Sequence, residues 1–338
     1  MKEARVYGKL EENRVECRLC AHNCRISPGK RGLCGVRENR GGTLYSLVYG
    51  KIIAEHVDPI EKKPLFHFHP GTRAYSIGTV GCNFRCAHCQ NSEISQLPHN
   101  HGGRIAGREC TPDDIVAAAR RTGSQTIAYT YNEPTIFFEF ARDTAVLAQQ
   151  ERIKNIFVSN GYMSRETTKR IAPYLDAINI DLKGFTDAFY KKICGARLQP
   201  VLDSIKRMKE AGVWLEVTTL VIPTLNDSEE ELRDIARFIR SVGADTPWHV
   251  SRFFPAYRLD HLPPTPVTTL QRAREIGLEE GLHYVYEGNV AEPGSENTYC
   301  PGCGKVVIER AGFHVAPGIG VKLGKCSRCG VHIAGEWG

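Results

Sequence analysis

Cysteines are the residues of this chain whose number and spacing point most directly to chemistry. The 338-residue sequence contains 13 cysteines, and most of them fall into three groups with short internal spacings. The N-terminal group is Cys17, Cys20, Cys24 and Cys34, the central group is Cys82, Cys86 and Cys89, and the C-terminal group is Cys300, Cys303, Cys326 and Cys329. Thiolates two or three residues apart can converge on one metal centre, so we expect three metal sites rather than disulfides.

The central group has three ligands in a Cys-x3-Cys-x2-Cys loop that directly follows a predicted strand. A structural zinc ion takes four protein ligands, and so does an ordinary electron-transfer 4Fe-4S cluster. A set of three cysteines therefore predicts an iron centre with one position left open for a substrate or cofactor. The alternative is half of a zinc site, completed by His88 or His99.

The two terminal groups are complete sets of four cysteines. The N-terminal spacing, Cys-x2-Cys-x3-Cys-x9-Cys, fits either zinc or a second 4Fe-4S cluster. The C-terminal group consists of two Cys-x2-Cys-Gly knuckles, which are typical of zinc ribbons and rubredoxins. We expect zinc there, with a single rubredoxin-type iron as the alternative. Cys110 and Cys194 lie outside the three groups and are expected to pack as small apolar residues. The alternative for Cys194, near the loop after the fourth strand, is a substrate-side thiol.

The elements that must position the central loop are strands alternating with helices between Arg73 and Asn289. The strand-like runs are 74–80, 126–132, 153–159, 177–182, 213–221, 248–254 and 282–287. They are almost continuously apolar or β-branched, as in parallel strands covered on both faces. Helix start signals occur at Thr111 and at Ser228. This pattern predicts an α/β fold, a partial (β/α)6-type TIM barrel with small cysteine-rich metal modules at both ends.

Three segments are expected. Residues 1–72 form an N-terminal four-cysteine module and lead-in, residues 73–289 the barrel, and residues 290–338 a zinc-ribbon or rubredoxin-like module. In parallel barrels, chemistry is located at the C-terminal ends of the strands. Polar residues occur at successive predicted strand ends, namely Glu133, Ser159, Asn160, Asp181 and Lys183, with His249 in the sixth run. Each residue alone is equally typical of a helix cap or a satisfied core group, but their recurrence favours a site.

With its three-cysteine loop after the first strand, the sequence resembles the radical S-adenosylmethionine (radical SAM) superfamily. The resemblance implies a catalytic 4Fe-4S cluster on Cys82, Cys86 and Cys89, whose fourth iron binds S-adenosylmethionine. One electron from this cluster would cleave the cofactor to a 5′-deoxyadenosyl radical that abstracts hydrogen from a substrate. The resemblance also implies cofactor-binding roles for seven residues: His88, Glu133, Ser159, Asn160, Asp181, Lys183 and His249.

Individual roles also follow from this resemblance. Glu133 would accept hydrogen bonds from the methionine ammonium, and Lys183 would hold the methionine carboxylate. His88 stands where many family members carry an aromatic residue near the adenine, and His249 resembles a histidine on the nucleoside side. Tyr131 and Asn132 stand where the family has two glycines.

The N-terminal cysteines, the segment 58–71 and the barrel motifs together resemble the radical SAM member of the AmmeMemoRadiSam system, which is related to pyruvate formate-lyase activating enzymes. This implies an external electron donor such as flavodoxin or ferredoxin, and an unidentified substrate for which a partner protein is one candidate. One alternative is an activase of a glycyl-radical enzyme. The others are a zinc-ribbon protein that binds nucleic acid or modifies RNA, and an electron carrier with several clusters.

Composition excludes several other classes of protein. The chain is 41% hydrophobic and 24% charged, which is ordinary for a globular protein and excludes fibrous and disordered chains. With 44 basic and 38 acidic residues, its net charge of +6 is too small to argue for nucleic-acid binding. No apolar run is long enough to cross a bilayer, and Met-Lys-Glu-Ala-Arg does not start a signal peptide. We therefore expect a cytoplasmic protein.

Overall fold

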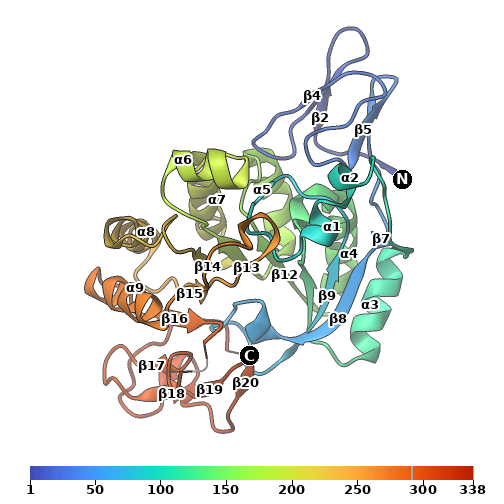
Figure 1. The fold of residues 1–338 in the computed structure, drawn as a ribbon. Coiled ribbons are helices and arrows are strands. Elements are labelled where there is room, and N and C mark those ends of the chain that lie inside the picture. The colour runs from blue at the N-terminus through green and yellow to red at the C-terminus, as the bar shows by residue number, and fades with distance from the viewer. Residues whose placement is uncertain (291, 338) are drawn as a thin grey trace.

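The centre of the computed structural model is an eight-stranded sheet that curves into an open barrel (Figure 1). The structure describes residues 1–290 and 292–337. Adjacent strands are parallel from β9 to β16, and β8 pairs antiparallel with β9 at one edge. Across the sheet, the strands are β16 (Val285–Gly288), β15 (Trp248–Arg252), β14 (Trp214–Val221), β13 (Ala177–Asp181), β12 (Lys154–Ser159), β11 (Thr126–Tyr129), β9 (Arg73–Gly78) and β8 (Ala54–Pro59).

Helices between successive strands cover the outer face of this sheet. The longer ones are α3 (Pro112–Arg121), α4 (Phe138–Gln150), α5 (Arg165–Ile171), α7 (Gln199–Glu210), α8 (Glu229–Val242) and α9 (Val267–Glu279). The short ones are α1 (Ser92–Ser95), α2 (Leu97–Asn100), α6 (Asp187–Phe189), the π-helix η4 (Tyr190–Cys194) and the 3-10 helices η1 (Ile60–Lys62), η2 (Pro134–Phe137), η3 (Ala172–Tyr174) and η5 (Tyr257–Leu259). No helix in the described ranges combines the length and apolarity needed to cross a membrane.

The helix starts follow from the caps that the sequence provides. Thr111 accepts a hydrogen bond from the amide of Asp114, and the Asp114 side chain accepts one from the amide of Thr111, which makes a complete capping box. Ser228 caps α8 by accepting a hydrogen bond from the amide of Glu231 at 3.3 Å, while the Glu231 side chain accepts from the amide of Phe185. Both predicted helix starts are therefore confirmed.

All seven predicted strand runs contain a strand, and the partial-barrel prediction is confirmed. The last strand begins three residues later than its predicted run, at Val285, because the amide of His283 bonds the carbonyl of Ala244 instead of a ladder partner. Strand β8 was not predicted. It lies at the sheet edge with exposed polar residues, among them His56, so it lacks the apolar pattern of a buried strand.

The N-terminal module consists of two small antiparallel sheets beside α1, α2 and α5 (Figure 1). Its strands are β1 (Lys2–Glu3), β2 (Tyr7–Lys9), β3 (Val15–Cys17), β4 (Arg25–Ile26), β5 (Arg37–Arg40) and β6 (Thr43–Ser46), and β7 (Lys51–Ile52) pairs with β10 (Arg108–Glu109). The module is joined to the barrel by an isolated antiparallel β-bridge between Cys20 and Met163. A hydrogen bond from the Ala21 amide to the Tyr162 carbonyl, at 3.0 Å, lies beside it. The division at residue 72 remains a prediction, since β8 belongs to the central sheet.

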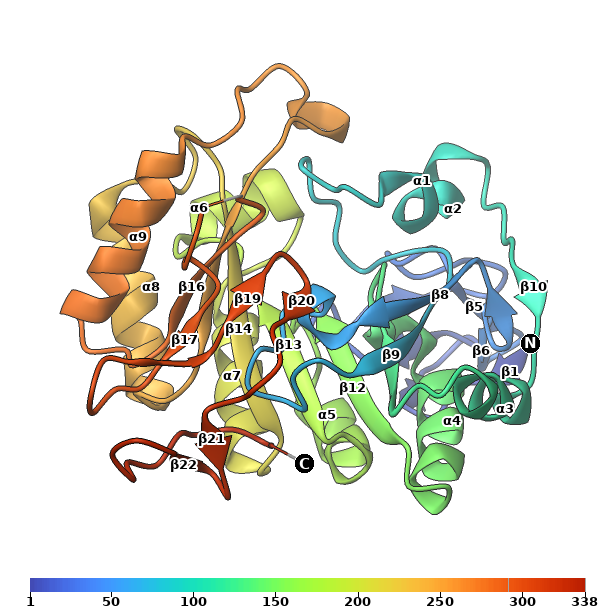
Figure 2. The same cartoon turned by 90° about the horizontal axis from the view of Figure 1, so that it is seen from below.

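The lead-in segment, residues 60–72, fills the barrel at the N-terminal ends of the strands. Ile60, Leu65 and Phe68 pack there against apolar residues of β9, β11, β12, β13 and β14. The C-terminal ribbon lies beside β16 on the same side of the molecule (Figures 1 and 2). Its strands are β17 (Thr298–Tyr299), β18 (Val306–Ile308), β19 (Arg310–Ala311), β20 (His314–Val315), β21 (Val321–Lys322) and β22 (Lys325–Cys326).

Candidate active site and metal centres

The three central cysteines lie in the loop that leaves the C-terminal end of β9. Cys86 is buried, whereas Cys82 and Cys89 are partly exposed. The amide of Phe84 donates to the Cys82 sulfur at 3.3 Å, and the Cys89 sulfur lies 3.1 Å from the hydroxyl of Ser95. The loop therefore holds three thiols at the open end of the barrel, as the sequence predicted.

Neighbouring strand ends and helices hold this loop in place. The Asn132 side chain donates to the carbonyl of Gly81 at 2.8 Å and to the hydroxyl of Thr79 at 3.1 Å. On the other side, the amides of Arg85 and Ala87 donate to the carbonyls of Cys194 and Ile193 in the π-helix, at 2.8 and 2.9 Å. Asn132 thus fixes the approach of the cysteine loop to the barrel.

The residues of this loop fit an iron–sulfur cluster that is held by three cysteines and binds a further molecule at its open position. Cysteines on one zinc ion must stand close together, whereas those on a multi-iron cluster bind different irons and stand farther apart. The sulfur atoms of the three central cysteines do not all lie within 4.8 Å of one another. The Nδ1 atom of His88 is buried and lacks a hydrogen-bond partner among those residues. Burial lowers the pKa of His88 to about 3, so the ring is a neutral group available to a ligand.

Glu133 is buried beneath the loop with both carboxylate oxygens already occupied by protein donors. One oxygen accepts from the Ser159 hydroxyl at 2.8 Å and from the amide of Thr135 at 2.9 Å, and the other accepts from the amide of Asn160 at 2.8 Å. Burial raises the pKa of Glu133, and these hydrogen bonds oppose the rise. The Asn160 side chain continues the network to Asn83 at 2.7 Å. Glu133 therefore joins the ends of β11 and β12 behind the cysteine loop.

Asp181 and Lys183 form an ion pair at the end of β13, with 2.9 Å between Oδ2 and Nζ. Burial opposes the charge of Lys183, but the Asp181 carboxylate and the nearby Cys86 and Cys194 thiols raise its pKa well above the usual value. Lys183 is therefore a fixed cation beside the cysteine loop. This arrangement brings together two residues that the sequence predicted to share one face.

His249 lies deeper, on the inner face of the barrel. The sheet register places it level with Asp181 across one strand, through Thr218. Its Nε2 lies 2.7 Å from a carboxylate oxygen of Glu216, and its ring stacks on Tyr286 with centroids 5.2 Å apart. Burial favours the neutral form of Glu216, yet the hydrogen bond and charge of His249 leave its pKa below the usual value. The predicted contact of His249 with the nucleoside stays a prediction.

Sequence reasoning missed one residue of this site, Glu216, and one contact, between Cys194 and Cys86. Glu216 was overlooked because it lies inside an apolar run, although a single acidic residue in a buried strand is itself a signal that a partner exists. Cys194 was expected to be a packing residue, with a substrate-side thiol as the alternative. Its thiol hydrogen-bonds Cys86 and is the main cause of the lowered pKa of Cys86. No sequence spacing indicates this contact, because the two residues lie 108 positions apart.

The terminal cysteine groups differ in geometry. The four C-terminal ligand atoms all lie within 4.8 Å of one another, with 3.5 Å between the sulfurs of Cys300 and Cys329 and 3.9 Å between those of Cys303 and Cys326. This set fits a single tetrahedral metal ion. In the N-terminal group, Cys17, Cys20 and Cys34 are buried and Cys24 is partly exposed.

Comparisons with known proteins identify the family of this chain. Residues 76–239 match the family model of the radical SAM superfamily. The chain is 48% identical over 335 residues to an uncharacterized protein of Methanocaldococcus jannaschii, which covers 98% of this chain and 99% of that protein. It is 24% identical to a pyruvate formate-lyase-activating enzyme of Clostridium pasteurianum, over 51% of this chain and 71% of the relative.

A GTP 3′,8-cyclase of Listeria monocytogenes is 26% identical, over 48% of each chain. Among solved structures, the crystal structure of Streptococcus suis SuiB bound to S-adenosylmethionine aligns with a TM-score of 0.51 and 14% identity, over 68% of this chain and 53% of that one. At that identity the structural likeness supports the fold alone. The narrower resemblance to the AmmeMemoRadiSam system stays a prediction.

Proposed function

Because this chain belongs to the radical SAM superfamily, we propose that it reductively cleaves S-adenosylmethionine and abstracts hydrogen from a substrate at the open end of its barrel. The observation that carries the proposal is the three-cysteine loop after β9. It offers three thiols and a buried His88 nitrogen that has no hydrogen-bond partner among the described residues. Relatives in this family are enzymes, and so is this chain.

Cys82, Cys86 and Cys89 would hold the 4Fe-4S cluster at the mouth of the barrel. When bound, the cluster and S-adenosylmethionine supply the one-electron cleavage that yields the hydrogen-abstracting 5′-deoxyadenosyl radical. The protein holds the loop rigidly through Asn132 and the π-helix. Burial of Cys86 and His88 limits the access of water to the reacting region.

Charged and polar side chains around the loop would orient the cofactor. Lys183, held by Asp181 at 2.9 Å, offers a cation to the methionine carboxylate. His88 would face the adenine and His249 the nucleoside. Glu133 was predicted to accept from the methionine ammonium, but its hydrogen bonds support a second role, in which it orients Ser159 and Asn160.

The test is product formation by the anaerobically reconstituted enzyme with dithionite and S-adenosylmethionine. The wild-type enzyme should release 5′-deoxyadenosine, and Cys86→Ala should reduce the rate at least about 100-fold because it removes a cluster ligand. Cys110→Ala is the matched control, since this buried thiol lies outside the three cysteine groups. Unchanged product from a folded Cys86→Ala enzyme would refute the proposal.

The names of two relatives bear on the class of substrate. Relatives named as activating enzymes of pyruvate formate-lyase and isethionate sulfite-lyase favour a protein substrate and an external donor such as flavodoxin or ferredoxin. Activation of a glycyl-radical enzyme is the narrower proposal, and it predicts a glycyl-radical signal in the electron paramagnetic resonance (EPR) spectrum of the partner.

Binding of nucleic acid by the ribbon is less favoured, because the apolar residues of the ribbon pack against Phe66, Tyr284 and Tyr286 of the barrel.

A further inference from the structure

The three cysteine groups differ in how far their sulfur atoms are spread. Four thiolates on one tetrahedral zinc, with bonds of about 2.3 Å, stand about 3.8 Å apart. The C-terminal group has this spacing, at 3.5 and 3.9 Å. Over residues 1–290 and 292–337, it is also the single group of three or more candidate ligands within 4.8 Å of one another. The sulfur atoms of the N-terminal group, like those of the core loop, therefore lie farther apart than four ligands of one zinc ion.

The N-terminal thiols nevertheless surround one buried place. Cys17 and Cys24 are tied by a bond from the Cys17 amide to the Cys24 carbonyl, at 2.9 Å. The Cys24 sulfur lies 3.6 Å from the position that a Cβ atom would take at Gly32, two residues before Cys34. Cys17, Cys20 and Cys34 are buried in one apolar cluster, and Cys24 packs against it. These contacts bring the chain segments that carry the four cysteines together.

A buried cation accompanies this group. Arg37 is 1% exposed, and its Nη2 atom bonds the buried carboxylate of Glu139. Its Nε and Nη1 atoms have no hydrogen-bond partner within the described part of the chain. The guanidinium is also near enough to Cys17 and Cys34 to lower their pKa values. Glu139 already gives this buried cation one opposite charge, and a centre with four thiolate ligands would place further negative charge on the side of Nε and Nη1.

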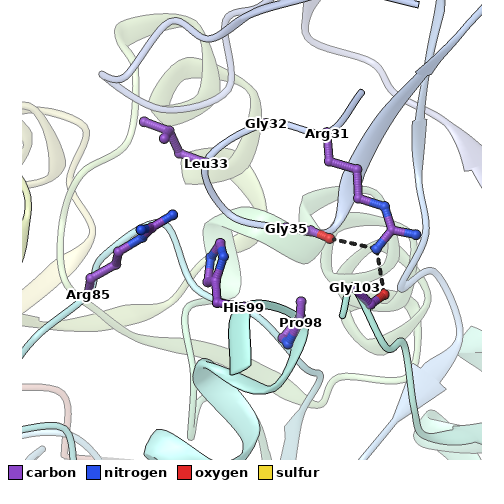
Figure 3. Close-up of a pocket in the computed structure, with 8 residues that line it drawn as sticks. All are labelled: Arg31, Gly32, Leu33, Gly35, Arg85, Pro98, His99 and Gly103. Atoms are coloured by element: carbon purple, nitrogen blue, oxygen red, sulfur yellow. Dashed lines mark hydrogen bonds between the residues drawn. The ribbon is translucent and has the colours of Figure 1, made fainter. Parts of the chain in front are cut away.

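The N-terminal group also lies against the core cysteine loop. The carbonyl of Cys34 is 2.9 Å from the position of a Cβ atom at Gly81, the residue before Cys82. His22, between Cys20 and Cys24, bonds the carbonyl of Asn83 through Nε2 at 2.8 Å. Residues beside Cys34 and Arg85 of the core loop line one cavity of about 320 Å³ (Figure 3). The two cysteine groups are therefore immediate neighbours.

We propose that Cys17, Cys20, Cys24 and Cys34 hold an iron–sulfur cluster rather than zinc, and that this cluster passes single electrons to the core site. It would accept one electron from a low-potential reductant of the flavodoxin or ferredoxin class and be reoxidised when it reduces the core cluster by one electron. The cluster assignment stands independently of the proposed function, whereas the electron transfer rests on it.

The metal content of the full-length chain tests the cluster. Anaerobically reconstituted wild-type protein should contain about eight iron atoms, and the triple variant Cys82→Ala, Cys86→Ala, Cys89→Ala should keep about four. The triple variant should also keep a dithionite-induced EPR signal that Cys20→Ser abolishes. Wild-type protein with about four iron and two zinc atoms would overturn the assignment, and this count needs no variant to fold. Cys110→Ala is the control for loss of a cysteine.

The electron transfer is tested separately in Cys20→Ser. With reduced flavodoxin as donor, reduction of the core cluster should slow at least about tenfold relative to wild type, and with dithionite it should change much less because this small reductant reaches the core directly. Equal slowing with both donors would overturn the electron transfer and leave the cluster assignment intact. Absence of 5′-deoxyadenosine in wild type, with about eight irons bound, would instead refute the proposed function and the electron transfer that rests on it, and would leave the cluster assignment intact.

Discussion

His67 illustrates how single residues determine the protonation state of the barrel interior. It is completely buried, with its Nδ1 atom 2.6 Å from the carbonyl of Ala334 and its Nε2 atom 2.5 Å from the hydroxyl of Tyr286. A carbonyl oxygen only accepts, so Nδ1 carries the proton and Nε2 accepts from the tyrosine. Burial lowers the pKa of His67 to about 4. The folded protein therefore contains this histidine as a neutral group.

A dependence of stability on pH follows from His67. The unfolded chain binds a proton below pH 6.5 and the folded chain only below about pH 4, so the stability that His67 contributes is complete above pH 6.5 and is lost as the pH falls toward 4. Between pH 7.5 and 5.5 this lowers the free energy of unfolding by roughly 1 kcal/mol. His67→Gln should lose less stability over the same interval in urea titrations.

His261→Gln provides the control, because His261 lies on the surface with its side chain 66% exposed. It should keep the wild-type dependence on pH. An identical loss of stability in His67→Gln and in wild type would show that His67 is protonated in the folded state.

At the scale of elements, the cysteine loop depends on close packing between segments that are distant in sequence. Gly81 has φ of +91°, and a Cβ atom there would lie 2.5 Å from Cγ1 of Val36 and 2.9 Å from the Cys34 carbonyl. The N-terminal module therefore approaches the loop through a space that only glycine leaves free. The same contact joins two cysteine groups that the sequence places in separate segments.

Gly81→Ala should destabilise the protein more than the same change at Gly102. Both residues have positive φ, +91° and +58°, so both substitutions cost backbone strain. Gly102 has no neighbour within 4 Å in the described structure, so the overpacking term is specific to Gly81. We expect a difference of about 2 kcal/mol in the free energy of unfolding, together with reduced iron content in Gly81→Ala. Equal effects would mean that the two segments separate easily.

The strands of the barrel could be predicted because their apolar runs are long and bounded by capped helices. The three cysteine groups could be predicted because ligand spacing is local in sequence. Other features depend on pairing across the fold and left no local pattern. Strand β8 is polar, Cys194 meets Cys86 only through the π-helix, and Glu216 meets His249 only because two strands are adjacent.

At the scale of the whole molecule, the C-terminal ribbon completes the end of the barrel filled by the lead-in segment. Arg310 donates to the carbonyl of Phe66 at 2.6 Å and to the hydroxyl of Thr298 at 2.8 Å, and its guanidinium lies 4.4 Å from the ring centroid of Phe66. The carbonyl of Glu336 accepts from the His69 amide, and its amide donates to the His67 carbonyl, both at 2.7 Å. The ribbon and the barrel therefore share one core.

If the four ribbon cysteines hold a metal ion, as their spacing fits, its loss should weaken the barrel end as well. Cys329→Ser removes an exposed ligand from the C-terminal group, and structural metal sites contribute directly to folding free energy. We expect the first calorimetric transition to fall by at least about 5 °C. Ser327→Ala, which changes a residue between Cys326 and Cys329 but removes no ligand, should leave the temperature of this transition unchanged. A transition unaffected by Cys329→Ser would mean that the ribbon folds without metal.

The pairing of the lead-in segment with the residues around Glu336 also fixes an order of events during synthesis. His67 and Glu336 are 269 positions apart, so the segment that fills the barrel is synthesised long before the residues that pair with it. Contacts of such long sequence separation are slow to form in folding. The cysteine loop is therefore synthesised while the opposite end of the barrel still lacks the residues that cover it.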